Sequence, residues 1–159
     1  MFRAIIFDFD GTILDTESLW FESYRAAARA RGVDLPVEVF EKIVGTYDDA
    51  MDRFLLERLG SEEALRALRR EAAGIHDEKV RTLALREGVL DYLEEARRLG
   101  LAVGLATSSP FSWVKRFFDM HGLAPYFDVL ATADDVERVK PDPALYRLAA
   151  RRLGVEPGR

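Results

Sequence analysis

A four-residue apolar run, residues 4–7, leads directly into two aspartates two positions apart, Asp8 and Asp10, and then into Gly11. The apolar run predicts a short buried strand, on which side chains two positions apart would share a face. The two carboxylates are therefore predicted to lie together at the carboxyl end of that strand, where open parallel sheets place their chemistry. Clustered carboxylates require a nearby cation or a shared proton. Gly11 permits a close backbone approach to a ligand, although a strand followed by a solvent-exposed Asp-Gly turn is the alternative.

The remaining sequence alternates between helical and strand patterns. Directly after the first strand, apolar residues spaced three and four apart predict a block of helices, separated by Gly32, Gly45 and Gly60. The later part predicts two further strands with helices around them, which indicates a parallel sheet covered by helices and an α/β fold class. Strands are predicted at residues 3–8, 101–106 and 128–131, and helices at residues 17–31, 36–44, 47–59, 61–73, 89–99, 111–120 and 142–153.

A second polar motif follows the predicted strand at residues 101–106. Thr107 and Ser108 come directly after its apolar residues, and Ser109 and Pro110 precede the next predicted helix. A hydroxyl beside backbone N–H groups at a helix start can hold a phosphate or an oxyanion. Ser109 is interpreted more simply as the N-cap of that helix, with Pro110 in the first helical position.

A third motif places Lys140 directly before Pro141, Asp142 and Pro143. Lysine is scarce in this chain, since nearly all of its 23 basic residues are arginine. Pro141 disfavours a helical conformation for the residue before it, so Lys140 is predicted to be extended. Asp142 is interpreted as the N-cap of the last helix, with Pro143 in its first position. A solvated surface lysine is the alternative for Lys140.

These three motifs, in this order, resemble those of the haloacid dehalogenase (HAD) superfamily of phosphohydrolases. Residues 8–17 are similar to the first motif of that family. The resemblance implies a Rossmann-like parallel-sheet HAD core with an inserted all-helical cap domain. The core would comprise residues 1–15 and 84–159, and the helical cap would comprise residues 16–83.

The resemblance also implies roles for individual residues. Asp8 would attack a phosphate monoester and form an aspartyl phosphate, while Asp10 would protonate the leaving alcohol and later deprotonate the attacking water. Thr107 would bind a phosphoryl oxygen, with the backbone N–H of Ser108 beside it, and Lys140 would hold the nucleophile and the phosphoryl charge. Mg²⁺, bound by the Asp8 carboxylate and the Asp10 carbonyl, would offset the repulsion between nucleophile and substrate.

One motif of the family is not found in this sequence. The family's fourth motif is an acidic pair at the end of another strand, which supplies a further metal ligand, and the sequence reaches residue 159 without it. Asp134 and Asp135 are conceivable substitutes, but in relatives this stretch precedes the lysine and does not bind the metal. We expect the chain to be an incomplete portion of a longer enzyme, lacking about 50 to 60 residues if two βα units are missing.

Substrate choice is expected to depend on the cap, where Trp20, Gly45 and Thr46 are the candidate substrate-binding residues. Relatives similar to β-phosphoglucomutase carry a histidine at the position of Trp20, so the aromatic residue favours hydrolysis over phosphate transfer within a sugar. Alternatively, Trp20 packs in a core, and the Gly-Thr pair is an ordinary helix end followed by an N-cap. His76 and His121 are expected to be structural or surface residues.

Composition excludes several classes of protein. With 48% hydrophobic and 32% charged residues in 159, the chain is predicted to form one or two compact soluble units. A net charge of −5 without a basic stripe argues against nucleic acid, and no apolar run approaches the roughly 20 residues of a membrane span. Without a signal-peptide pattern, a cytoplasmic location is expected. The absence of cysteine excludes thiol chemistry, and the absence of Asn and Gln fits either a thermophile or a GC-rich genome.

The leading hypothesis is a Mg²⁺-dependent phosphoric monoester hydrolase that acts on a small phosphate ester such as a sugar phosphate. A phosphosugar mutase similar to β-phosphoglucomutase and a noncatalytic HAD-like fragment are the alternatives. The oligomeric state is left open by the sequence. An uncovered sheet edge would nevertheless favour pairing between chains, so dimers or aggregates are expected at high concentration.

Overall fold

The computed structural model describes residues 2–43 and 49–156. The chain divides into two compact units: Met1–Asp15 with Ala84–Arg159, called here the sheet unit, and Thr16–Leu83, called here the helical unit. No helix in the described ranges is both long enough and apolar enough to cross a membrane.

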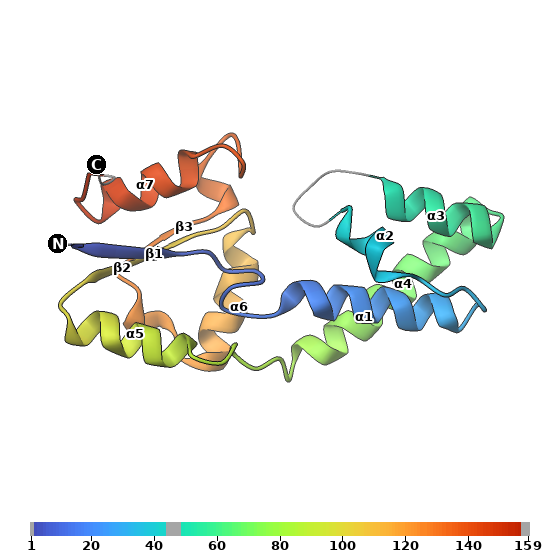
Figure 1. The fold of residues 1–159 in the computed structure, drawn as a ribbon, viewed down its shortest axis with the longest axis horizontal. Coiled ribbons are helices and arrows are strands. Elements are labelled where there is room, and N and C mark those ends of the chain that lie inside the picture. Colours follow the sequence, from blue (N-terminus) through green and yellow to red (C-terminus); the bar gives the residue numbers. More distant parts are fainter. Residues whose placement is uncertain (1, 44–48, 157–159) are drawn as a thin grey trace. The chain divides into compact units, whose positions relative to one another are not determined.

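The sheet unit contains three parallel strands in the order β1-β2-β3 (Figure 1). The strands are β1 Ala4–Phe7, β2 Ala102–Ala106 and β3 Val129–Ala131. Because the strands are parallel, their carboxyl ends meet at one edge of the sheet. Asp8 follows β1, Thr107 follows β2 and Thr132 follows β3 at this edge.

Helices cover both faces of this sheet. In Figure 1, α7 lies over one face, and α5 and α6 lie against the other. Their bounds are α5 Val89–Arg98, α6 Phe111–His121 and α7 Ala144–Arg152, with short 3₁₀ turns at η1 Ala124–Tyr126 and η2 Ala133–Asp135. This arrangement confirms the α/β fold class predicted from the alternating pattern.

The core beneath α7 depends on a glycine in the central strand. Ile6, Gly104 and Val129 are register partners across the three strands. A Cβ atom at Gly104 would lie 3.1 Å from Leu153 Cδ1 and 3.2 Å from Val129 Cγ2. The glycine therefore allows the side chains on either side to approach each other and α7 to pack closely. The surrounding buried cluster comprises Ala106, Ala131, Leu145 and Ala149.

On the other side of the sheet unit, aromatic rings fill the core. Phe9 is fully buried, and its ring centroid lies 5.8 Å from that of Phe117 on α6. Phe7 and Phe127 meet edge to face at 6.1 Å. Because Phe9 lies between Asp8 and Asp10 in the sequence, its burial anchors the segment that carries both carboxylates.

The helical unit consists of α1 Thr16–Arg29, α2 Val37–Glu41, α3 Ala50–Leu59 and α4 Glu62–Val80. Gly60 follows α3 with a φ of +75°, a left-handed conformation that glycine adopts without strain. Ser61 caps α4, since its hydroxyl accepts a hydrogen bond of 3.2 Å from Ala64 N. The unit has its own apolar core, which includes Ala27, Ala28, Leu35, Leu55, Leu68 and Ala72.

The structure contains the predicted helices and strands, but several of them begin or end at other residues than predicted. The helix predicted to end at residue 73 continues through Gly74 to Val80, because buried residues keep recurring at helical spacing as far as His76 and Val80. The helix predicted at residues 36–44 is the short α2. The predicted start of α3 at residue 47 lies outside the described residues.

Candidate active site

The candidate site lies where the three strands end in the sheet unit. Four predicted catalytic residues, Asp8, Asp10, Thr107 and Lys140, belong to this unit. Contacts from the segments after β2 and β3 reach both aspartates.

Asp8 forms an ion pair with Lys140. The Lys140 Nζ atom lies 2.6 Å from Asp8 Oδ1, and Phe9 N donates to the same oxygen at 2.7 Å. Within the described part of the chain both contacts fall on Oδ1, which leaves Oδ2 available to a metal ion or a phosphorus atom. The Asp8 side chain is 35% exposed, so a ligand can reach it. The alternative of a solvated Lys140 does not fit this contact.

Lys140 also lies beside an aromatic ring that none of the three sequence motifs includes. Its Nζ atom is 4.9 Å from the centroid of Tyr146, at a distance typical of a cation–π contact. Tyr146 is on α7, six positions after Lys140. The ring and the Asp8 carboxylate together restrict where the ammonium group can lie.

Asp10 is held by the segment that follows β2. Ser109 Oγ donates to Asp10 Oδ2 at 2.5 Å, and Trp113 Nε1 donates to Asp10 Oδ1 at 3.0 Å. The interpretation of Ser109 as a simple N-cap is therefore wrong. The residue before α6 is Pro110, and Phe111 N at the helix start donates instead to the Asp134 carboxylate at 2.8 Å.

The predicted phosphate-binding residues, Thr107 and Ser108, contact the residues that bind the two aspartates. Thr107 is 1% exposed, and its Oγ1 atom accepts a hydrogen bond of 3.0 Å from Ser109 N. Ser108 is exposed, and its Oγ atom accepts a hydrogen bond of 3.3 Å from Lys140 N. The hydroxyl group of Thr107 thus contacts Ser109, which binds Asp10. The hydroxyl group of Ser108 contacts Lys140, which pairs with Asp8.

The acidic residues after β3 have structural contacts. Besides the contact of Asp134 with α6, Asp135 Oδ2 accepts a hydrogen bond of 2.8 Å from Thr132 N, and Asp135 Oδ1 lies 2.6 Å from Arg152 Nη2. The hydrogen bond from Arg152 and those from Thr132 lower the pKa of Asp135. Across the described residues, no group of three or more His, Asp or Glu side chains is arranged to hold a metal ion.

Of the predicted substrate-binding residues in the helical unit, Trp20 lies within the described part of the chain. The ring of Trp20 stacks on that of His76, with centroids 3.7 Å apart and an interplanar angle of 12°. His76 is 2% exposed, which agrees with its expected structural role, and Trp20 packs against the apolar core of the unit. This favours packing for Trp20 and leaves substrate binding untested. Gly45 and Thr46 lie outside the described residues.

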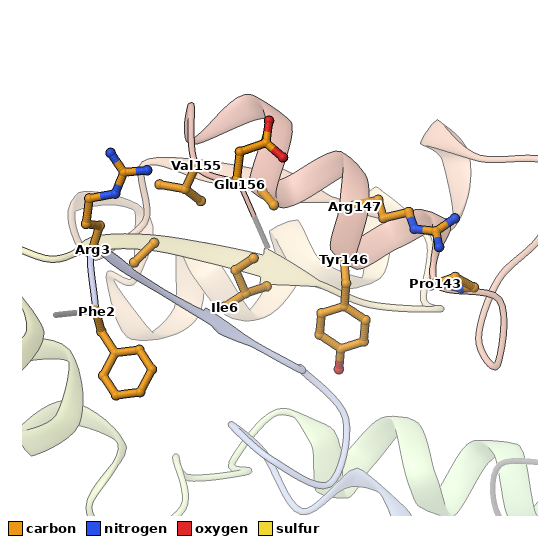
Figure 2. Close-up of a pocket in the computed structure, with 10 residues that line it drawn as sticks. Phe2, Arg3, Ile6, Pro143, Tyr146, Arg147, Val155 and Glu156 are labelled. Atoms are coloured by element: carbon orange, nitrogen blue, oxygen red, sulfur yellow. The ribbon is translucent and has the colours of Figure 1, made fainter. Parts of the chain in front are cut away.

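A groove elsewhere in the sheet unit has a volume of about 580 Å³. It runs along β1 and α7, and its lining is mainly apolar (Figure 2). The lining residues labelled in Figure 2 are Phe2, Arg3, Ile6, Pro143, Tyr146, Arg147, Val155 and Glu156. It contains none of the predicted catalytic residues, so we do not assign the reaction to it.

Known proteins are similar to this chain over nearly all of its length. YhcW, a candidate phosphatase of Bacillus subtilis, is 44% identical over 99% of this chain and 72% of that protein. A phosphorylated carbohydrates phosphatase of Thermotoga maritima is 34% identical over 98% of this chain and 72% of that protein.

Solved structures agree with the observed fold. A candidate β-phosphoglucomutase of Thermotoga maritima is 31% identical, with a TM-score of 0.78 over 98% of this chain and 72% of that one. CbbY of Rhodobacter sphaeroides, in complex with xylulose-1,5-bisphosphate, is 29% identical, with a TM-score of 0.67 over 99% of this chain and 75% of that one. The family model described as haloacid dehalogenase-like hydrolase matches residues 5–159. This chain therefore belongs to the haloacid dehalogenase-like hydrolases.

Proposed function

We propose that this chain is a phosphatase that hydrolyses small phosphate monoesters, sugar phosphates among them, with Asp8 as its nucleophile. The observation that carries the proposal is the 2.6 Å contact between Asp8 and Lys140 at the carboxyl edge of the sheet. A carboxylate that attacks a phosphate faces like-charge repulsion, and a fixed ammonium group offsets it. The relatives named as phosphatases support the same reaction class.

The reaction proceeds in two displacements at phosphorus. An oxygen of Asp8 attacks, the bond from phosphorus to the ester oxygen breaks, and Asp10 passes a proton to the departing alcohol. Asp10 then takes a proton from a water molecule whose oxygen attacks the same phosphorus atom. The bond to Asp8 breaks, and inorganic phosphate leaves. Thr107 and Lys140 bind the phosphoryl oxygens during both displacements.

Mg²⁺ fits the oxygen donors of this site in part. The Asp8 carboxylate and the Asp10 backbone carbonyl are hard oxygen ligands, and Mg²⁺ commonly binds through one or two carboxylates together with waters and substrate phosphate. When bound there, it would neutralise charge on the phosphoryl group. Asp134 and Asp135 are not assigned to it, because their contacts are with α6, Thr132 and Arg152.

We propose that the helical unit acts as a cap that selects the ester. The name of one relative, hexitol phosphatase B of Escherichia coli, points to phosphorylated sugar alcohols for that protein. Phosphorylated sugars and sugar alcohols are therefore the first substrates to test. Transfer of phosphate within a sugar is the competing activity, which Trp20 disfavours because an indole in this stack cannot relay a proton.

The deciding experiment measures inorganic phosphate released from p-nitrophenyl phosphate and a panel of sugar phosphates, with Mg²⁺ and with EDTA. We expect Mg²⁺-dependent release that is lost in Asp8→Asn and kept in Lys115→Ala. Lys115 is a suitable control because it is an exposed lysine paired with Asp119 on α6. No release from any ester by the wild-type chain would reject the proposal. Conversion of glucose 1-phosphate to glucose 6-phosphate without release would assign a mutase instead.

A further inference from the structure

Both oxygens of the Asp10 carboxylate accept hydrogen bonds from one short segment. Ser109 Oγ contacts Oδ2 at 2.5 Å, and Trp113 Nε1 contacts Oδ1 at 3.0 Å. The two donors are four positions apart, on either side of the start of α6. With one donor on each oxygen, the carboxylate cannot rotate about its terminal bond without breaking a hydrogen bond.

The serine donor is itself held by its backbone. Ser109 N donates to Thr107 Oγ1 at 3.0 Å, and Ser109 O accepts from Ala133 N at 3.0 Å. These contacts join the serine to the end of β2 and to the turn after β3. The backbone position of Ser109 is therefore fixed, which places its hydroxyl group within hydrogen-bond distance of Asp10.

The tryptophan donor is held by its ring. Trp113 is half-buried, and its ring meets that of Phe117 edge to face, with centroids 4.9 Å apart at 77°. Phe117 is fully buried and packs against Phe9, the residue before Asp10. The same aromatic cluster thus orients both the indole N–H group and the backbone that carries its acceptor.

We propose that Ser109 and Trp113 are positioning residues, which fix the orientation in which Asp10 exchanges a proton with the leaving alcohol. The inference rests on the role proposed above for Asp10. Packing alone would not need the indole nitrogen, since phenylalanine would fill a similar place beside Phe117. The segment that binds the phosphoryl group through Thr107 thereby also aligns the group that serves the leaving oxygen.

Substrates with different leaving groups distinguish a role in positioning Asp10 from a purely structural role of Ser109 and Trp113. The p-nitrophenolate ion leaves without a proton, whereas a sugar alkoxide needs one. kcat/KM covers the steps up to the first irreversible one, here the transfer to Asp8 in which the leaving oxygen is protonated. Loss of alignment at Asp10 should therefore slow sugar phosphates selectively.

The first experiment compares kcat/KM for the two substrate types. Trp113→Phe and Ser109→Ala should lower kcat/KM for a sugar phosphate roughly 10- to 100-fold, which is a part of what general acid–base catalysis contributes. The same substitutions should change kcat/KM for p-nitrophenyl phosphate by less than about threefold. Ser109→Thr keeps a hydroxyl group and should keep most of the activity. Ser112→Ala, an exposed serine on the same helix turn, should leave both substrates unchanged. Equal losses on the two substrates, or a change in KM alone, would overturn the proposal.

A second experiment does not depend on turnover. The chain has two tryptophans, so its NMR spectrum contains two indole N–H signals, and Trp113→Phe identifies the one from Trp113. Asp10→Asn should shift that signal and leave the other in place. An unchanged Trp113 signal would reject the contact and with it the proposal. If the signal shifts but no ester is hydrolysed by the wild type, the proposed function fails and not the contact.

Discussion

Lys140 is the residue on which the charge balance around Asp8 depends. Lys140→Met removes the ammonium group and keeps a flexible chain of similar length, so we expect kcat/KM for phosphate esters to fall on the order of 100- to 1,000-fold. Lys140→Arg should not restore activity, because a planar guanidinium cannot take the place of a compact ammonium between a carboxylate and the Tyr146 ring. Phosphate release, with circular dichroism to check folding, measures both effects. Full activity in Lys140→Met would contradict the assignment.

Individual residues differ in how far the sequence could predict their contacts. The meeting of Asp8 and Lys140 was predictable, because parallel strands deliver their following residues to one edge and a resemblance identified the lysine. The contact of Trp113 with Asp10 was not, because the partners are 103 positions apart and a tryptophan on an amphipathic helix normally indicates packing. Ser109 was misinterpreted because a serine before proline and a helix matches the N-cap pattern, while a distant carboxylate, Asp134, holds the helix start.

At the level of elements, Gly74 lowers the stability of α4. It is inside the helix, and a Cβ atom built there meets nothing within 4 Å. Gly74→Ala should therefore raise the free energy of unfolding by about 0.5 to 1 kcal/mol, since alanine loses less backbone entropy than glycine on folding. Urea unfolding followed by circular dichroism measures the gain. Gly122→Ala is the matched contrast and should destabilise, because Gly122 has a φ of +63°.

Gly104 in β2, unlike Gly74, has no room for a larger side chain. Leu153 and Val129 occupy the space above it, at 3.1 and 3.2 Å from the place that a Cβ atom would take. Gly104→Val should push α7 away from the sheet and lower the free energy of unfolding by about 1 to 3 kcal/mol. Gly104→Ala should have a smaller effect. Thermal unfolding of the two variants tests the order, and a valine variant as stable as wild type would contradict the packing described for this face.

The turn after β3 and helix α7 are joined by a pH-dependent contact. The pKa of Asp135 is lowered in the folded protein, chiefly by Arg152, so the ionised form stabilises the fold above the unfolded pKa of about 4. This contribution is lost as pH falls through the lower folded pKa. Asp135→Asn should therefore be less stable than wild type at pH 7, with a difference that shrinks below about pH 4. Glu137→Gln, an exposed neighbour, should show no such change in urea titrations.

Elements were more predictable in kind than in length. The apolar runs predict the strands β1 and β2, and Gly60 predicts the end of α3. The helix predicted over residues 61–73 is shorter than α4, which continues to Val80, a residue buried in the helical unit. Tertiary packing, which a local pattern does not contain, decided that end.

For the whole molecule, the uncovered side of β1 should promote self-association. β1 pairs with β2 on one side, and within the described residues no strand pairs with its other side. Its residues are all apolar, and Phe2 beside it is 90% exposed, so the charges that usually protect an edge strand are missing from the strand itself. We expect the sedimentation coefficient to rise with concentration, and Phe2→Lys to reduce the rise. A single monomeric species at all concentrations would contradict this.

The ion pair between Asp8 and Lys140 also has a consequence for synthesis on the ribosome. Asp8, the proposed nucleophile, precedes the helical unit in the sequence, whereas Lys140 follows it, so the lysine is translated only after the entire helical unit. During elongation, the growing chain therefore carries the Asp8 carboxylate before the ammonium group of Lys140 is available to pair with it, and on the proposed mechanism it gains activity only once Lys140 has been added. A nascent chain stalled before Lys140 should already have a folded helical unit and yet be unable to cleave phosphate esters.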